Sequence, residues 1–405
     1  MYISNIEDWV KEVGMKIQKK EFAFYLSYIM LYVSLFIGDV YSINELDAVA
    51  KLLRLGSYAL IAVSSINLKL KRNDFFCLVV IFITTLFYGL KTGDLYWSIL
   101  ILFIYNTKKI NTENIYKISY KTIVIGIIIV LGCCALGLLP DVLTSRDTVK
   151  SISFDRHSFG FYHSNVIPLL IFYLEVYYIC IAKEKVKDLA IVLYMFSAFI
   201  ASFFCNSRNA LFCSVILSIF VLFEKRKSQR THRFLYKVAI LEVPCLSLFS
   251  FAMMFLLLKG GIWNSIDTAF SGRFRLAIFK MRRIGLHLIN IMSNNDFLND
   301  NLVYVNGKKL DTIVLDNGYL YVMLRYGFLI LVFYFIVAFL LADKNKRNGC
   351  VLYAVITVFI INFVDNDLVD YSFLPFILWA FNDWKANPIV KNVEEKFSRK
   401  HLGSI

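Results

Sequence analysis

One acidic residue stands directly before one of the most apolar stretches of the sequence. Asp316 is followed by Asn317 and, after nine further residues, by Gly327, in the run VLDNGYLYVMLRYG. A carboxylate at the start of an apolar helix can cap it by accepting backbone N–H groups. The same carboxylate can act as a general base if a reacting hydroxyl group lies against it. The two roles are compatible, and the sequence leaves both open.

Other residues compete with Asp316 for the role of base. Asp365, Asp367 and Asp370 lie together in DNDLVD, between two apolar runs. His157 and His163 lie in the polar segment 140–165 and are alternative proton acceptors. A solvated loop would account for either group without any catalytic role.

Two arginines beside these segments suggest a site for anions. Arg208 lies in a short polar turn between two apolar runs, and we expect it to stabilise negative charge that develops on a leaving group. Snorkelling to lipid headgroups is the alternative for Arg208. Arg325 lies inside an apolar run, so it should either line a polar pocket for a lipid phosphate or pair with Glu175. Pairing is the favoured interpretation.

A basic amphipathic segment precedes Asp316. Residues 270–292 place apolar and basic residues at helical spacing after Ser271, which is the expected N-cap. Such a helix either lies along anionic lipid headgroups or clamps a phosphate-bearing lipid. The apolar stripe is Phe274, Ile278, Met281, Gly285 and Leu288, and the basic residues are Arg273, Arg275, Lys280, Arg282, Arg283 and His287. After it, Asn306-Gly307 between Val-Tyr-Val and Lys-Lys-Leu predicts a short β-hairpin.

Composition places the chain in a membrane. It has 405 residues, of which 58% are hydrophobic and 18% charged, whereas soluble domains carry about 25% charged residues. The net charge of +14 would suggest nucleic acid in a soluble protein, but here we assign it to loops that set membrane topology and expect no nucleic-acid partner. The eight cysteines lie in or beside apolar runs without C-x-x-C spacing, which argues against a metal or disulfide framework.

The apolar runs predict an all-α polytopic membrane protein with about twelve transmembrane helices. Residues 1–405 form one integral membrane domain with two large outer loops, 140–165 and 259–317, and the second carries the amphipathic helix and the hairpin. Inner segments hold roughly twice as many Lys and Arg residues as outer loops if both termini are cytoplasmic. The expected helices are 22–38, 48–67, 75–90, 94–106, 118–139, 166–182, 189–205, 209–223, 237–258, 318–341, 349–364 and 371–384.

This layout resembles the Wzy-type polysaccharide polymerases and the related O-antigen ligases, in a GT-C-like architecture. The ligase pattern is His, then Asn, Ser or Gln, then nine residues and Gly. Asp316, Asn317 and Gly327 match its spacing, but Asp316 replaces the histidine, which favours a polymerase over a ligase. The segments SRNALF (207–212) and GFYHSNVIP (160–168) also resemble polymerase segments. The resemblance covers most of the chain as architecture and only a few residues as motif.

The resemblance implies a metal-independent glycosyltransferase without a cofactor, in the bacterial cytoplasmic membrane. It would join undecaprenyl-pyrophosphate-linked oligosaccharide units into O-antigen or capsule polysaccharide at the outer face. A chain-length regulator and a flippase are further expected partners. Asp316 and Arg208 would be catalytic. The expected substrate-binding residues are Arg156, His163, Asn165, Arg273, Arg275, Arg282, Arg283, Asn317, Tyr319 and Arg325.

Two alternatives remain open. A ligase would transfer the same glycan to a different acceptor, and a flippase would move lipid-linked sugars across the membrane. Transporters often contain repeated halves, and no repeat relates residues 1–200 to 201–405. The polymerase hypothesis requires that Asp316, Arg208 and the basic helix converge at one pocket just outside the lipid.

Overall fold

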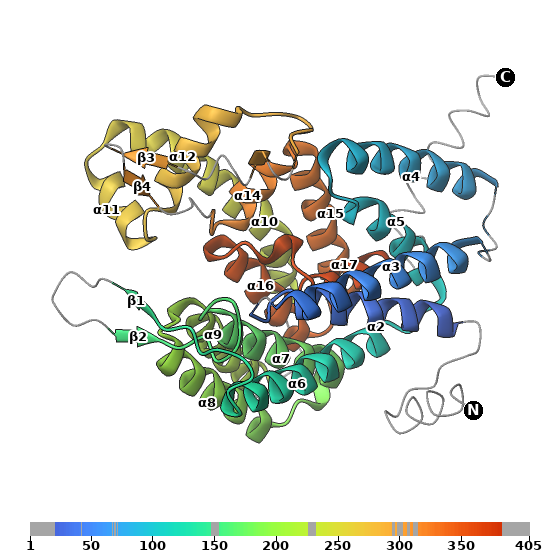
Figure 1. The fold of residues 1–405 in the computed structure, drawn as a ribbon, viewed down its shortest axis with the longest axis horizontal. Helices are drawn as coiled ribbons and strands as arrows, with labels where there is room; N and C mark the ends of the chain where they lie inside the picture. The colour runs from blue at the N-terminus through green and yellow to red at the C-terminus, as the bar shows by residue number, and fades with distance from the viewer. Residues whose placement is uncertain are drawn as a thin grey trace.

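The computed structural model describes residues 21–382 apart from 42, 67, 69, 71, 147–153, 226–231, 294–295, 298–302, 306–307 and 311–314. Most of this part of the chain is helical, and Figure 1 shows the helices packed side by side. The α-helices of its first half are α2 (Phe22–Ile37), α3 (Asn44–Ile66), α4 (Arg72–Thr92), α5 (Tyr96–Asn106), α6 (Thr112–Ala135), α7 (Val166–Ala182) and α8 (Asp188–Cys205). Those of its second half are α9 (Arg208–Glu224), α10 (His232–Leu256), α11 (Ile262–Ala269), α12 (Arg273–Ile284), α14 (Gly318–Arg325), α15 (Phe328–Asn345), α16 (Gly349–Val364) and α17 (Leu374–Phe381).

Several helices are suited to lipid by length and composition. In the ranges that the structure describes, seven helical segments are long and apolar enough to cross a membrane. Many of their large apolar side chains are exposed, such as Phe76, Ile128 and Phe203, as expected for a surface that faces acyl chains. The seven are Asn44–Ile66, Arg72–Thr92, Thr112–Ala135, Val166–Lys185, Asp188–Cys205, His232–Lys259 and Phe328–Asn345. The chain is therefore an all-α protein of multi-pass membrane type.

Each predicted apolar run contains a helix, but one run is broken. The prediction of a continuous helix over 318–341 is wrong, because α14 ends at Arg325 and α15 begins at Phe328. Between them Gly327 has φ +99°, a conformation that favours glycine. Its amide hydrogen bonds to the Met323 carbonyl at 3.1 Å, and the next amide, of Phe328, bonds to the His287 carbonyl at 3.0 Å. The chain thus leaves the helical path to pack against the segment after α12.

The basic helix is shorter than its sequence pattern predicts. The structure has α12 at Arg273–Ile284, ended by Gly285 with φ +81°, so the rest of 285–292 is not helical. Ser271 is not the N-cap, which is Gly272; the Asp267 carboxylate of α11 instead accepts the backbone N–H groups of Phe274 (3.0 Å) and Arg275 (3.4 Å).

Two small hairpins accompany the helices. The predicted hairpin is confirmed, since β3 (Val303–Val305) pairs antiparallel with β4 (Lys308–Leu310), with Val305 opposite Lys308. The turn residues Asn306 and Gly307 lie outside the described ranges. A second antiparallel pair, β1 (Thr144–Arg146) and β2 (Phe154–Arg156), was not predicted. Short 3-10 helices complete the fold at Thr107–Lys109, Lys183–Lys185, Leu257–Lys259 and Asp367–Val369.

Hydrogen bonds gather the loops at one end of the bundle. Tyr41 N–H donates to the Gly160 carbonyl (2.9 Å), and Tyr162 N–H donates to the Asp39 carbonyl (3.0 Å). Gly318 N–H donates to the Asp365 carbonyl (2.8 Å). Residues from four loops that are distant in sequence therefore meet at this end, which the distribution of Lys and Arg predicts to be the outer one.

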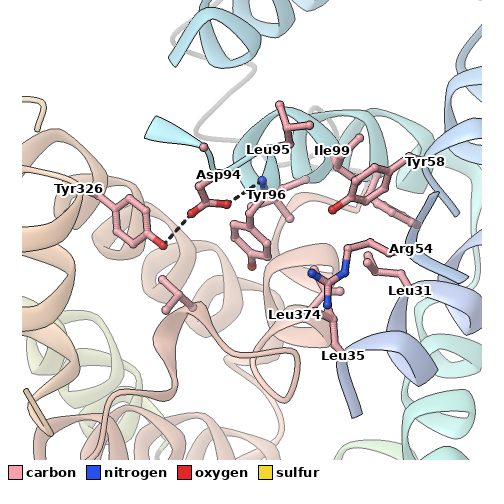
Figure 2. A pocket seen from close by; sticks show the side chains of 14 residues that line it. Leu31, Leu35, Arg54, Tyr58, Asp94, Leu95, Tyr96, Ile99, Tyr326 and Leu374 are labelled. Carbon is pink, nitrogen blue, oxygen red and sulfur yellow. Dashed lines mark hydrogen bonds between the residues drawn. The ribbon is translucent and has the colours of Figure 1, made fainter. Parts of the chain in front are cut away.

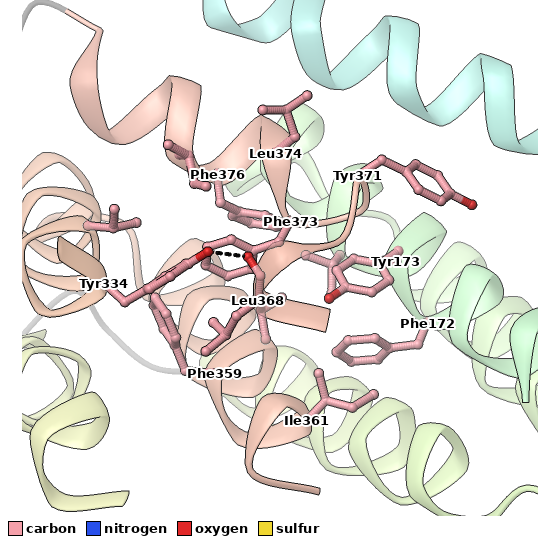
Figure 3. Close-up of a cluster of buried hydrophobic side chains, with 14 of the residues drawn as sticks. Phe172, Tyr173, Tyr334, Phe359, Ile361, Leu368, Tyr371, Phe373, Leu374 and Phe376 are labelled. Carbon is pink, nitrogen blue, oxygen red and sulfur yellow. Dashed lines mark hydrogen bonds between the residues drawn. The ribbon is translucent and has the colours of Figure 1, made fainter. Parts of the chain in front are cut away.

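The segment that connects α16 to α17 is anchored in the core. Figure 3 shows Phe373, Phe376 and Leu368 from this region packed among aromatic side chains of α7, α15 and α16. The Tyr334 hydroxyl donates to the Leu368 carbonyl at 2.6 Å. Burying so many rings holds the loop in one place, which matters because the loop carries Asp365 and Asp370.

Candidate active site at one end of the bundle

Asp316 is not the residue that caps the following helix. The N-cap of α14 is Asn317, whose side-chain oxygen accepts the Leu320 N–H at 3.0 Å. The amide group of Asn317 donates to the Ser250 hydroxyl (3.1 Å) and to the Phe363 carbonyl (2.9 Å), and the residue is buried. The capping interpretation of Asp316 is therefore wrong, and its carboxyl group is left for other contacts.

The carboxyl group of Asp316 lies beside the first residue of the basic helix. Its Oδ2 is 3.7 Å from Nε of Arg273, and the two side chains are 41% and 11% exposed, respectively. This separation is too long for a hydrogen bond, and Arg273 Nε is buried without a hydrogen-bond partner. The guanidinium of Arg273 thus holds a positive charge beside the half-buried carboxyl group of Asp316.

A second acid, Asp365, stands close to Asp316. Burial and, to a lesser extent, the charge of Asp316 raise the pKa of Asp365 to about 7, and Arg273 opposes the shift. Asn209, in the first turn of α9, donates to the Val364 carbonyl (3.3 Å) and also hydrogen bonds to the Asp365 side chain. The C-terminal end of α16 and the N-terminal ends of α9 and α14 therefore meet around these two acids.

The loop before α7 supplies the other side of the cluster. Arg156 donates from Nη2 to the Asn165 side-chain oxygen (2.6 Å) and from Nε to the Cys205 carbonyl (3.1 Å). The charge of His163 opposes the rise in the pKa of Asp316, and burial, followed by the charge of Arg156, lowers the pKa of His163. The structure therefore brings together five residues predicted separately, namely Arg156, His163, Asn165, Arg273 and Asp316.

The balance of charges decides how Asp316 titrates. Burial raises the pKa of the Asp316 carboxyl above its usual range, while Arg273 and His163 oppose the shift. Burial lowers the pKa of His163, as does Arg156, and Asp316 opposes that shift. A carboxylate with a raised pKa is a stronger proton acceptor than an ordinary aspartate, which suits it to general-base chemistry near neutral pH.

Arg208 is near this cluster but does not reach Asp316. It begins α9 and is exposed, and it makes no hydrogen bond or ion pair within the ranges that the structure covers. Its neighbour Asn209 contacts the 364–365 segment instead. The structure thus places Asp316 beside Arg273 of the basic helix, whereas Arg208 is exposed and lies one residue from Asn209. A pocket shared by all three stays a prediction.

Other predicted binding residues are engaged elsewhere. Arg275 pairs with the buried Asp267 (3.6 Å), and the Tyr319 hydroxyl donates to the Phe359 carbonyl (2.7 Å). Arg282 and Arg283 are exposed on α12. The favoured pairing of Arg325 with Glu175 is wrong, because Glu175 accepts hydrogen bonds from the hydroxyls of Ser214 and Ser218.

Arg325 occupies a separate buried environment. It is fully buried and donates from Nη1 to the Met292 carbonyl at 2.8 Å. Its guanidinium also lies over the rings of Phe297 (5.3 Å) and Tyr326 (5.2 Å). Lys280 lies over the same Phe297 ring at 4.3 Å and is itself buried, although its sequence position predicts an exposed basic stripe.

The alternative bases have different positions. His157 Nδ1 lies 2.5 Å from Asp141 Oδ2, and the other oxygen of Asp141 accepts the N–H groups of Ser158 and Phe159, so this pair shapes the loop. Asp370 lies near Asp39, which follows the end of α2. The Asp39 carboxylate accepts a hydrogen bond from the Tyr371 hydroxyl at 2.7 Å. The side chain of Asp367 is not described.

Sequence reasoning missed Asn209 as a neighbour of the acids. The six-residue segment SRNALF pointed to Arg208, yet the adjacent amide makes the tertiary contact. It also missed Arg54 and Asp94, which line a separate cavity. The position of Arg54 as a charged residue within an apolar helix could have indicated a buried polar site. For Asp94 the sequence offered no such indication beyond its position in a short turn.

The raised pKa of Asp365 gives a prediction about stability. An acid with a pKa of about 7 when folded and an ordinary value when unfolded penalises folding at alkaline pH, and the penalty shrinks as pH falls below 7. We therefore expect Asp365→Asn to raise the unfolding temperature at pH 8 and to raise it less at pH 5.5. Thermal unfolding of the purified protein at both values measures this. The exposed Glu45→Gln is the matched control, and a gain that is equal at both pH values would contradict the prediction.

Comparison with protein-family models, with curated proteins and with solved structures finds no match for this chain.

Proposed function

We propose that this protein polymerises polyprenyl-pyrophosphate-linked oligosaccharides, with undecaprenyl pyrophosphate as the carrier, at the outer face of the bacterial cytoplasmic membrane. The observation that carries the proposal is the half-buried Asp316 beside Arg273, whose Nε has no hydrogen-bond partner. The pair combines a proton acceptor with a cation that can bind an anionic leaving group. The proposal includes twelve spans, cytoplasmic termini and a GT-C-like architecture.

In the proposed reaction, a sugar hydroxyl of the acceptor unit gives its proton to the Asp316 carboxylate. The hydroxyl oxygen bonds to the anomeric carbon of the donor glycan, and the bond from that carbon to pyrophosphate breaks. The electron pair leaves with the polyprenyl pyrophosphate, whose added charge faces Arg273. Arg156 holds the amide of Asn165, and His163 adds a polar ring on the acceptor side. The pyrophosphate is already activated, so the transfer proceeds without a nucleotide sugar.

An apolar cavity near this cluster supports the proposal of a lipid carrier. The cavity has a volume of about 490 Å³ and lies between α10, α14, α15 and residues 286–288. Ser247 and Phe251 of α10 line it, and between them on the helix Ser250 accepts the hydrogen bond from Asn317. A prenyl chain in this cavity would therefore lie against α10, the helix that also contacts Asn317.

The direct test uses purified protein in lipid vesicles with a lipid-linked repeat unit from the same cells. A ladder of longer lipid-linked glycans should form without a metal ion or nucleotide sugar. A ladder that requires a nucleotide sugar, or transfer only to a different acceptor, would overturn the polymerase proposal. The second outcome would favour a ligase, which differs in the acceptor alone.

Replacing Arg273 by Gln should change both rate and pH dependence. Arg273 opposes the rise in the pKa of Asp316, so its loss raises that pKa further. The active form is the carboxylate, and activity is therefore lost as pH falls through the pKa of Asp316. We expect the acidic limb of the pH–activity profile to move to higher pH, with about a tenfold or larger loss at neutral pH. The exposed Lys259→Gln should leave the profile in place, and an unmoved limb in Arg273→Gln would contradict the assignment.

A further inference from the structure

A second cavity lies at the same end of the bundle, away from Asp316. It has a volume of about 350 Å³ and is bounded by α2, α3, the turn before α5, and residues of α5 and α17. Most of its lining is aliphatic or aromatic. The polar groups of the lining belong to Arg54, Asp94 and three tyrosines, Tyr58, Tyr96 and Tyr326. Figure 2 shows Arg54 reaching in from α3, and Asp94 on the opposite side with Tyr96 between them.

The cation in this cavity has no ion-pair partner among the described residues. Arg54 Nε donates to the Ser34 hydroxyl at 3.3 Å, a neutral partner. Among the residues with described positions, no acid forms an ion pair with Arg54. Arg54 is the eleventh residue of α3, and a charged side chain at such a depth in a membrane helix is expected to serve a polar site. Its terminal nitrogens are therefore available to a ligand.

The opposite wall offers hydrogen-bond acceptors and aromatic faces. Asp94 Oδ1 accepts the Tyr96 N–H at 3.0 Å, and Oδ2 accepts the Tyr326 hydroxyl at 3.2 Å. Each carboxyl oxygen keeps a further lone pair. The Tyr96 hydroxyl is buried without a hydrogen-bond partner, and the Tyr58 ring stands beside Arg54. A buried hydroxyl group without a partner, on a residue that lines a cavity, is expected to gain a partner when a polar ligand binds.

We propose that this cavity binds a sugar residue that carries a carboxylate. The planar guanidinium of Arg54 matches a carboxylate with two parallel N–H bonds. Asp94 can accept hydrogen bonds from sugar hydroxyls, and the tyrosine rings offer flat surfaces to the sugar ring. The volume lies at the low end of the range for ligand pockets, which suits one or two sugar rings. The inference rests on the proposed function, since this sugar would belong to the lipid-linked glycan.

The cavity suits a carboxylated sugar better than a lipid phosphate. A phosphate monoester or pyrophosphate carries more negative charge than one carboxylate, so the acid across the cavity would repel it more strongly. One cation is sufficient for a carboxylate, and the remaining polar groups match neutral hydroxyls. The substrate class is therefore a repeat unit that contains a uronic acid or another carboxylated sugar.

Ligand binding by the full-length protein in lipid nanodiscs tests the proposal. The probes are D-glucuronate and D-glucose, measured by saturation-transfer NMR titration at equal concentrations. The wild-type protein should bind glucuronate at least about tenfold more tightly than glucose, because of the charge-assisted bidentate pair. Arg54→Met should lose this preference. Arg54→Lys keeps the charge but not the two parallel N–H donors of the guanidinium, so it should retain only part of the preference.

Lys51→Met is the matched control, because Lys51 is an exposed cation one turn earlier on α3 and does not line the cavity. It should bind glucuronate like the wild type. Equal binding of the two sugars, or an unchanged preference in Arg54→Met, would overturn the inference. Binding of short-chain phosphatidylglycerol that Arg54→Met abolishes, with no binding of glucuronate, would identify a lipid headgroup site instead.

The outcome is separable from that of the proposed function. Asp316→Asn should still prefer glucuronate, since Asp316 does not line this cavity. Binding by a protein that makes no glycan ladder would leave the acidic-sugar site standing and remove the polymerase. Size-exclusion profiles and unfolding temperatures show whether each Arg54 variant is folded. If Arg54→Met does not fold, the partial loss of preference in Arg54→Lys provides a second test.

Discussion

Asp316→Asn should abolish long glycan chains while the protein accumulates normally in the membrane. The substitution keeps the shape of the side chain and removes the group that accepts a proton. General-base catalysis contributes about a hundredfold to ten-thousandfold, so we expect at least about a hundredfold loss of polymerisation. The fold should survive, because Asn317 caps α14 and Asp316 makes no capping bond.

The measurement is a glycan ladder from cells that carry the variant as their only copy, alongside immunoblotting of membranes. The control is Asp155→Asn, an exposed acid in β2, which should give the normal ladder. Asp316→Glu should restore a small part of the activity, since the carboxylate returns at a different reach. A normal ladder from Asp316→Asn would remove Asp316 from the mechanism, and Asp365 would then be the next acid to test.

Gly327→Ala should destabilise the protein strongly, although the substitution adds only one methyl group. The glycine has φ +99° and ψ 171°, a region that other residues occupy at a cost of about 1–3 kcal/mol. An added Cβ would also lie 2.6 Å from the Leu288 carbonyl oxygen and 2.8 Å from the Ile289 Cα. Backbone atoms cannot move aside as a flexible side chain does, so we expect a total loss of more than about 3 kcal/mol.

Thermal unfolding in detergent, with the amount of folded protein after purification, measures this effect. Gly132→Ala is the matched control, because this glycine is in α6 and its added Cβ would meet no atom within 4 Å. That control should be neutral or slightly stabilising, since alanine favours a helix. If Gly327→Ala unfolds at the same temperature as Gly132→Ala, the break between α14 and α15 does not need glycine.

The spacing from Asn317 to Gly327 has a physical meaning that the sequence pattern did not reveal. Asn317 caps α14 and Gly327 lies just beyond its end, so the spacing measures an eight-residue helix. Hydropathy alone could not show this break, because the apolar pattern continues across it. The reason for the break is contact with the His287–Leu288 backbone, about forty residues earlier, which local patterns do not encode.

The extent of the basic helix shows a similar limit. Helical periodicity predicted α12 correctly over its twelve residues, including the burial of Phe274 and Ile278. The same periodicity placed Lys280 on an exposed stripe, but tertiary packing encloses it against Phe297. Periodicity describes faces of an isolated helix, whereas contact with Phe297 decides that the face with Lys280 is covered.

Part of the candidate site could be predicted from the sequence. Asp316 was selected by its position before an apolar run, and its proximity to Arg273 followed from a basic helix in the same loop. Asp365 was one of three equivalent acids in a loop, and its proximity to Asp316 and its contact with Asn209 distinguish it in the structure. Its neighbours come from α9, α14 and α16, and α9 precedes the other two by more than about a hundred residues, a separation that local patterns cannot bridge.

The position of α4 at the edge of the bundle has a consequence for the cavity that contains Arg54. In α4 few side chains are buried, and the helix packs chiefly against α5, so its tilt should follow the thickness of the surrounding bilayer. Asp94 is tied to the end of this helix by its N–H bond to the Gly89 carbonyl at 3.1 Å. Longer acyl chains would therefore shift Asp94 relative to Arg54, and the affinity for acidic sugar should depend on the membrane in which it is measured.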